Sequence, residues 1–579
     1  MAAIVEPVSS RELECRKICV ERFIFAIMYS VAAQYVLLTM FLLLVNFSVL
    51  HPIGWLLDSF RLLCSLSTWM WIMPLISAVI VHGIFLAKSY LSGVTYCPTR
   101  FQQIYRTIIQ KWILLVVNCA IGFLTAWLYT RFLRDEYRNL FLPAENGKYI
   151  LNEKYLFLVL GGTFAGVYFF IKNKTEQASL SFPVIQQARY QQIRSQLYDI
   201  VYRSLFKSVV PTLIYTSFFY TFCCVYFRHK VTALFQGVTL AEESSLGSFY
   251  SILIDIRLLL YCWILLSQIL SNMNLMQMLF HIFLTEYREF PLERSSMVTD
   301  SEVTLTEALA SKQILIVQQL AALNLFTIAE DHDGTRRSRL YALSIPGGHP
   351  YNWRLVSGEC IRLIRHFSAE LSKSIEAASS QARPEVNKLR PTASGDAEKI
   401  LMKQYNESYG IRSLSSFAES ATDPASKPQP SNICQTVDRR LDVLRSMLCS
   451  IPGIYYLFGE PKTAKPCYLL ASQSQQIVWV SQALASLAAH SIAEDQFGVV
   501  QDDLPSIIRT LLHLKQTVDK VGSIQLDVKK VDRNYLALRA AIRRSLYRIT
   551  YAFADYLIDI VLEPNDIKAL QGFINYREV

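Results

Sequence analysis

The chain has 579 residues, a formal net charge of +10 and 12 cysteines. The positive charge suits a protein beside anionic membrane surfaces. It would also suit nucleic acid, but the sequence has no helix-turn-helix, zinc-finger or RNP-like motif, so no direct nucleic-acid binding is expected. The cysteines are scattered without a CxxC pair, so the sequence indicates neither a disulfide framework nor a zinc site.

Six apolar runs lie within the first 285 residues, and none follows them. A hydrocarbon core about 30 Å thick needs about 20 mostly apolar residues in one helix, and only helices or closed barrels satisfy backbone polar groups in lipid. The sequence therefore predicts a cytosolic tail over residues 1–22 and a six-helix transmembrane region over 23–285. The predicted spans are 23–45, 68–87, 112–130, 155–171, 207–227 and 249–270.

Two of these spans have unusual residues. The fourth contains Gly161, Gly162 and Gly166, and small residues let helices approach closely in lipid, so we expect it to pack tightly against its neighbours. The sixth contains Asp255 and Arg257. Charges inside a membrane often mark a transport path. Alternatively, this span begins later and leaves both residues near the interface, or the two form an internal structural pair.

Loop charges indicate the orientation of the spans. The N-terminal tail and the second and fourth loops are richer in Lys and Arg than the opposite set of loops. By the positive-inside rule, this favours both termini in the cytosol. The third loop opposes this orientation, although acidic residues accompany its basic ones.

After residue 286 the hydrophobic pattern becomes periodic and predicts an all-α cytosolic domain in two parts, 286–378 and 433–579. Between them, residues 379–432 combine low hydrophobicity with scattered prolines, which predicts a disordered linker. In the second part, Asp503 followed by Pro505 predicts a helix start with an acidic cap. The chain as a whole is thus predicted to be all-α.

Two short patterns imitate functional motifs. His490 and Asp495 have the HxxxxD spacing of membrane glycerolipid acyltransferases, which would make the histidine a base oriented by the carboxylate. The alternative is a helix-end histidine beside a capping acid. The segment 331–334 (DHDG) looks like the start of a calcium loop, but the ligand spacing does not continue. A polar turn is therefore the favoured interpretation.

The segment 189–207 has the pattern of a basic amphipathic helix leading into the fifth span. Such helices often lie in the membrane interface, and packing on a neighbouring helix is the alternative. The candidate membrane-surface residues are Arg189, Ile193, Arg194, Leu197, Ile200 and Arg203.

Four strings carry a resemblance to a known family: HPIGWLLDSF at 51–60, FPVIQQ at 182–187, PGGHPYNW at 346–353 and EDQFGVVQ at 494–501. Their order and spacing, together with the six preceding spans, resemble the NDC-one family of integral-membrane nucleoporins of the nuclear pore complex. The resemblance extends over nearly the whole chain, except for the linker, and suggests an animal member.

This resemblance implies a protein of the nuclear envelope with six transmembrane helices and both termini on the cytosolic or pore side. It implies that the protein anchors the pore scaffold to the pore membrane, supports pore assembly and recruits soluble nucleoporins. The implied partners are an aladin-type β-propeller nucleoporin, an inner-ring nucleoporin with an RRM-like domain, and pore membrane lipids. It implies no enzymatic activity and no cofactor or metal. The competing interpretations are a polytopic transporter, for which no internal repeat was detected, and a lipid acyltransferase.

The two later strings provide candidate structural or partner-binding residues. In the first, paired glycines and a proline form a turn, and Asn352 is placed to cap a helix starting at Trp353. In the second, Phe497 and Gly498 are expected to end a helix and insert the aromatic ring into the domain core. The full set is Gly347, Gly348, His349, Pro350, Asn352, Trp353, Phe497 and Gly498.

Overall fold

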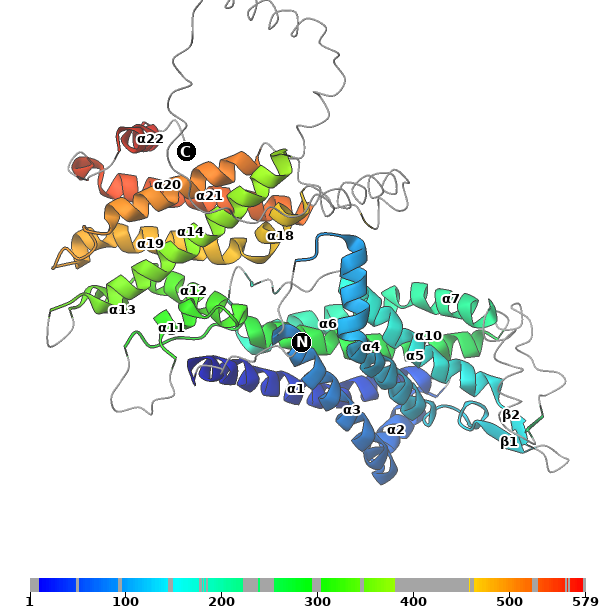
Figure 1. Ribbon diagram of the computed structural model, residues 1–579. Helices are drawn as coiled ribbons and strands as arrows, with labels where there is room; N and C mark the ends of the chain where they lie inside the picture. Colours follow the sequence, from blue (N-terminus) through cyan, green and yellow to red (C-terminus); the bar gives the residue numbers. More distant parts are fainter. Residues whose placement is uncertain are drawn as a thin grey trace, which may run out of the picture.

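The fold is an all-α arrangement of membrane-type helices joined to a second helical body (Figure 1). The computed structural model describes residues 10–47, 51–91, 96–143, 149–175, 180, 182–183, 186–221, 238–239, 255–293, 303–343, 348–380, 458, 463–522, 529–557, 560 and 563–575. The predicted fold class is confirmed. Within the described residues, three strands of two or three residues are the exception to the helical structure.

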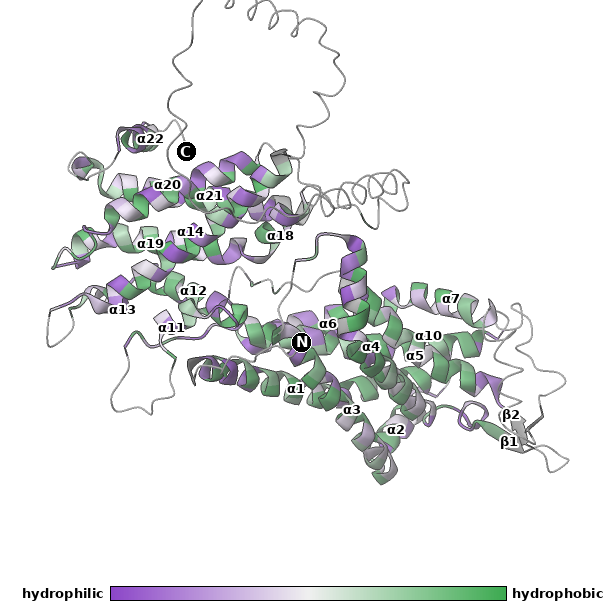
Figure 2. Cartoon of the chain, viewed as in Figure 1, coloured by the Kyte–Doolittle hydropathy of each residue, from purple (hydrophilic) through white to green (hydrophobic). Residues whose placement is uncertain are grey.

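Five of the described helices are long and apolar enough to cross a membrane. Hydrophobic residues dominate this half, whereas hydrophilic residues are more frequent in the second body (Figure 2). The candidate spans are Glu12–Val45 in α1 (Ser10–Val45), Leu66–Leu91 (α3), Lys111–Thr130 in α4 (Arg100–Thr130), Glu153–Lys172 in α5 (Glu153–Thr175), and Ile256–Thr285 (α10). A short helix, α2 (Pro52–Leu63), separates α1 from α3.

The predicted fifth span, 207–227, is described only to residue 221. In that part, α6 (Arg189–Lys207) is followed directly by α7 (Val209–Phe218). The count of six spans therefore stays a prediction, with five found in the described part of the chain.

Two helix bounds differ from the predicted spans. Residues 10–22, predicted as a tail, continue α1, because Arg22 is buried and donates to the backbone carbonyls of Phe283 (3.1 Å) and Leu284 (3.0 Å). Helix α10 begins after Asp255, which accepts a hydrogen bond from the backbone N–H of Leu258 (3.2 Å), and it continues to Thr285 instead of ending near residue 270. Both helices thus reach beyond the apolar runs that predicted them.

The fourth predicted span packs closely, as expected. A Cβ atom added to Gly162 would lie 2.3 Å from the carbonyl oxygen of Gly122 on α4, and one added to Gly166 would lie 2.3 Å from that of Asn118. Contacts that short leave no room for a side chain. The backbones of α4 and α5 therefore approach each other through glycines.

A small three-stranded sheet lies beside the end of the α4–α5 pair. Strands β1 (Phe141–Pro143) and β2 (Tyr149–Leu151) pair antiparallel, with Phe141 opposite Leu151. Strand β3 (Val238–Thr239) adds in parallel, with Tyr149 opposite Val238. A 3₁₀ turn, η1 (Asp135–Tyr137), precedes β1.

The second body consists of helices on both sides of the predicted linker, which lies outside the described residues except for the last two residues of α14. Before the linker come α11 (Leu305–Ala310), α12 (Leu315–Ala329), α13 (Thr335–Tyr341) and α14 (Tyr351–Ser380). After it come α18 (Ala464–Ser472), α19 (Ser474–Glu494), α20 (Leu504–Val521), α21 (Lys529–Ala552), η4 (Ala554–Tyr556) and α22 (Pro564–Ile574).

The buried apolar residues form two clusters, and only one is confined to the membrane half. That cluster joins α1, α3, α4, α5, α7 and α10. The larger cluster begins at Cys15 of α1, continues through the end of α10 at residues 275–284, and extends without a break into α12, α14, α19, α20 and α21. One hydrophobic core therefore crosses the predicted boundary at residue 286.

Candidate functional site

The turn before α14 brings the string at 346–353 (PGGHPYNW) into the domain core. Gly348 has a φ of 65°, which favours glycine, while Gly347 lies outside the described residues. Helix α14 begins at Tyr351, two residues before the expected start at Trp353. Asn352 is consequently inside the helix and not its cap, and its side chain donates to Glu293 Oε1 (2.6 Å).

Trp353 connects this string to the segment that follows the string at 494–501 (EDQFGVVQ). Its ring is fully buried, and its Nε1–H donates to Asp503 Oδ2 (2.9 Å). The Ser357 hydroxyl donates to the same oxygen (3.1 Å). Asp503 was predicted to cap α20, but it makes no side-chain cap, because its carboxylate accepts these two bonds from α14 instead. The segments around 348–357 and 494–503 thus meet at one carboxylate.

The second string forms a tight turn after α19. Asp495 Oδ1 accepts from the backbone N–H of Phe497 (3.1 Å), Oδ2 accepts from that of Val500 (2.9 Å), and Gly498 has a φ of 67°. Phe497 is 60% exposed, so the expectation that its ring enters the core was wrong. The turn held by Asp495 directs the ring outward.

The acyltransferase interpretation of His490 and Asp495 is not supported by this geometry. Both Asp495 oxygens accept backbone N–H groups, and no hydrogen bond joins His490 to Asp495, both of which the structure describes. Partial burial, followed by the positive charge of Arg337, lowers the pKa of His490. Asp495 is therefore a turn-forming acid, as the alternative interpretation expected.

Arg337, which the sequence analysis did not single out, ties this turn to the segment 331–334. Its Nε and Nη2 donate to Glu494 Oε2 (2.8 Å) and Oε1 (2.5 Å). Its Nη1 donates to the carbonyls of Ala329 (3.0 Å) and Asp331 (2.8 Å). The arginine side chain is 4% exposed and that of Glu494 is 24% exposed, so this is a bidentate ion pair with a buried guanidinium.

This arrangement makes 331–334 a polar turn. Gly334 has a φ of 63° and starts α13, and the backbone N–H of Asp333 donates to Asp331 Oδ1 (3.4 Å). Within the part of the chain that the structure describes, no group of three or more His, Cys, Asp or Glu side chains could hold a metal ion. The carbonyl of Asp331 is bound by Arg337 instead.

The apolar face of α6 packs on the protein. Ile193, Leu197 and Ile200 lie against the larger hydrophobic cluster. Antiparallel contacts fix α6 along α10: Arg189 pairs with Glu286, and Asn274 Nδ2 donates to Ser204 Oγ (3.1 Å). Packing on a neighbouring helix, the alternative given for this segment, therefore accounts for its apolar face, and a position of α6 at the membrane surface stays a prediction.

Helix α6 also continues almost directly into α7. The backbone N–H of Ser208 donates to Ser204 O (3.0 Å), and that of Thr212 donates to Ser208 O (3.0 Å). The face turned away from the protein carries exposed Tyr198, Tyr202 and Phe206. Arg194 and Arg203 are also exposed, and Arg203 pairs with Asp199 (2.6 Å).

The charges at the start of the sixth predicted span lie at a helix end. Asp255 caps α10 and pairs with Lys154 at the start of α5 (3.0 Å). Arg257 is exposed in the first turn. This matches the interpretation in which the span begins later, and it does not support an intramembrane transport path.

Comparisons with known proteins agree with the resemblance noted in the sequence. The family described as "Nucleoporin protein Ndc1-Nup" matches residues 17–571. Nucleoporin Ndc1 of Drosophila melanogaster is 34% identical, covering 98% of this chain and 99% of that protein. Nucleoporin NDC1 of Danio rerio is 26% identical (97% and 98% covered), and that of Homo sapiens is 25% identical (96% and 97% covered). This chain belongs to the Nucleoporin protein Ndc1-Nup family and is a nucleoporin of the nuclear pore with membrane-type helices.

Proposed function

We propose that this nucleoporin anchors the scaffold of the nuclear pore complex to the pore membrane, supports pore assembly and recruits soluble nucleoporins. The observation that carries the proposal is the hydrophobic core shared by α1, α10 and the second helical body. A continuous core holds a recruiting domain in a fixed position relative to the bilayer. A flexible tether would leave that domain free to move.

The proposed partners are an aladin-type β-propeller nucleoporin and an inner-ring nucleoporin with an RRM-like domain. Exposed Phe497, presented on a turn that Asp495 holds in place, supports a recruiting surface in the second body. Aromatic residues are enriched at the centres of protein interfaces. The proposed orientation, with both termini on the cytosolic or pore side, places this surface where soluble nucleoporins are available.

Flotation tests the recruiting role. The full chain is reconstituted into liposomes, and either purified partner is added before density-gradient centrifugation. We expect at least one partner to float with the protein-containing liposomes and neither to float with empty ones. Equal flotation in both samples would contradict recruitment.

A glycosylation acceptor placed at either terminus should stay unmodified, and its modification would contradict the orientation.

The proposed lipid contact of α6 is its outward aromatic face. Tyrosine rings are favoured at the membrane interface, and Tyr198 stacks on Tyr202 with ring centroids 6.0 Å apart. A fluorescent label on Tyr202→Cys should be quenched by brominated lipids more strongly than one on Ile200→Cys, whose side chain faces the protein. Equal quenching would contradict this contact.

No observation favours a second function. The acyltransferase geometry is not present at His490 and Asp495, and the charges at Asp255 lie at a helix end. The names of the relatives indicate a structural nucleoporin.

A further inference from the structure

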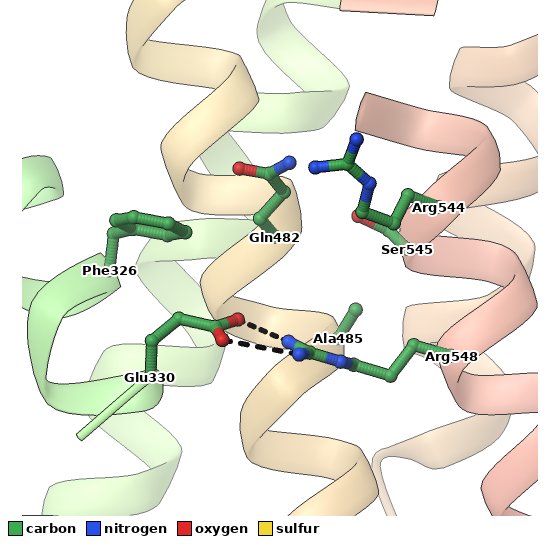
Figure 3. A pocket seen from close by; sticks show the side chains of 7 residues that line it. All are labelled: Phe326, Glu330, Gln482, Ala485, Arg544, Ser545 and Arg548. Atoms are coloured by element: carbon green, nitrogen blue, oxygen red, sulfur yellow. Dashed lines mark hydrogen bonds and ion pairs between the residues drawn. The ribbon is translucent and has the colours of Figure 1, made fainter. Parts of the chain in front are cut away.

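A cavity of about 150 Å³ opens between α12, α19 and α21 in the second helical body (Figure 3). Helix α12 contributes an aromatic ring, and the residue directly after it contributes a carboxylate. Helix α19 contributes an amide, and α21 contributes two guanidinium groups and a hydroxyl. These side chains are Phe326, Glu330, Gln482, Arg544, Ser545 and Arg548. The sequence motifs discussed above contribute none of them.

The positive charges in this cavity are only partly compensated. Arg548 binds both carboxylate oxygens of Glu330, one of them at 3.1 Å. Burial alone would raise the pKa of Glu330, but the hydrogen bond and charge of Arg548 outweigh it and lower that pKa. Arg544 forms no ion pair with any residue that the structure describes, and Figure 3 shows its guanidinium extending towards Gln482 across the opening. One positive charge is thus left for a ligand.

The cavity also contains a buried hydroxyl that lacks a partner. Ser545 is 2% exposed, and its Oγ has no hydrogen-bond partner in the described part of the chain. Leaving a buried polar atom unsatisfied costs about 1–3 kcal/mol. A ligand oxygen that accepted a hydrogen bond from this hydroxyl would remove that cost.

The donors fit a carboxylate at the end of a short aliphatic stem. A guanidinium presents two parallel N–H groups to a planar pair of oxygens, and Arg548 already binds Glu330 in this way one helical turn from Arg544. Phe326 and Ala485 form an apolar wall, against which methylene groups would pack.

The surroundings favour a protein ligand. Tyr547 and Tyr551 lie three and seven residues after Arg544, so they share its side of α21. Their ring centroids are 6.0 Å apart, and Tyr551 is 72% exposed. Arginine and tyrosine are the residue types that dominate binding energy at protein interfaces.

We propose that this cavity is a binding site for an acidic side chain, glutamate or aspartate, on a protein partner, with Arg544 and Ser545 as its donors. This proposal rests on the recruitment function proposed above at one point: the acidic ligand is taken to belong to a protein. The ion pair between Glu330 and Arg548 forms the floor of the site and keeps Arg548 from competing for the ligand.

The test uses the full chain in detergent micelles and a fluorescein-labelled Gly-Ser dodecapeptide with two central glutamates. Fluorescence anisotropy compares it with the same peptide carrying glutamines. We expect the acidic peptide to bind at least tenfold more tightly. Arg544→Gln should remove that difference and Ser545→Ala should reduce it. The control Arg533→Gln, an exposed arginine on the same helix outside the cavity, should leave it unchanged.

Three outcomes would overturn the proposal: equal binding of the two peptides, equal loss with Arg533→Gln and Arg544→Gln, or inorganic phosphate binding to the same site more tightly than the acidic peptide. The last would identify a free-anion site. Circular dichroism checks that each variant keeps its helical content. The peptide assay uses neither liposomes nor the proposed partners. A failure of the peptide to bind would therefore contradict the cavity proposal without contradicting recruitment, which the flotation assay tests separately.

Discussion

At the residue scale, the side chain of Arg337 connects two parts of the second body. Its guanidinium joins the distant Glu494 to the carbonyls of Ala329, at the end of α12, and of Asp331, just after it. Removing one partner of a buried pair leaves the other charge uncompensated, which costs more than the pair itself contributes.

Arg337→Met should lower the free energy of unfolding by about 3–5 kcal/mol, because Glu494 and two backbone carbonyls lose their donors. Thermal and denaturant unfolding of the full chain in detergent measures the change. Arg339→Met provides the control, since Arg339 is exposed on the same helix. Similar losses in both variants would contradict a specific role for Arg337.

The same pair predicts a dependence of stability on pH. The hydrogen bond from Arg337 lowers the pKa of Glu494 below its ordinary 4.5, against the effect of burial. A carboxyl group with a depressed folded-state pKa contributes stability above its unfolded pKa and loses it as pH falls through the folded one. The stability difference between the wild type and Glu494→Gln should therefore be fully present at pH 7 and shrink progressively below pH 4.5. A difference that stays constant down to pH 3 would contradict this ion pair.

At the element scale, the pairing of α4 with α5 depends on backbone contact. The carbonyl of Gly122 occupies the space where a side chain on Gly162 would lie. Lipid provides little hydrophobic drive for helix association, so close van der Waals packing matters more than it does in water.

Gly162→Val should separate these helices and markedly lower the thermal stability of the membrane half. The readout is the melting temperature of the full chain in detergent. Gly54→Ala is the control, because its added Cβ would meet only the Cβ of His51 at 3.8 Å. If Gly162→Val melts like the wild type, the close approach of α4 and α5 is not what holds this pair together.

At the scale of the whole molecule, the membrane helices and the second body share one core. Phe280 of α10 lies within it and stacks against Phe23 of α1 and Tyr90 of α3, with ring centroids 5.5 Å and 5.9 Å away. Because the same cluster continues into α12, a disturbance at Phe280 is expected to reach beyond the membrane helices.

Phe280→Ala should cost about 3–5 kcal/mol through the cavity that it leaves. Hydrogen exchange should become faster in α12 as well as in α1, α3 and α10. The control Met28→Ala, at a 60% exposed position on α1, should change neither region. Faster exchange confined to the three membrane helices would show that the two halves unfold separately.

The sequence determined the helical class, the positions of most long helices and the close packing of the glycine-rich span. These follow from local properties: apolar runs of membrane length, helical periodicity, and the small size of glycine. The resemblance carried by four strings was enough to indicate the family. The sequence also supplied the turn residues Gly348 and Gly498, since a positive φ favours glycine wherever the turn lies.

Only the tertiary structure decided what those residues contact. Asp503 accepts bonds from Trp353 and Ser357 instead of capping its own helix, and Phe497 points outward because Asp495 holds the turn. Periodicity shows that α6 has an apolar face but not what covers that face, since lipid and a neighbouring helix favour the same residues. Likewise, the Arg337–Glu494 pair joins positions far apart in the sequence, and such contacts exist only once the helices have packed.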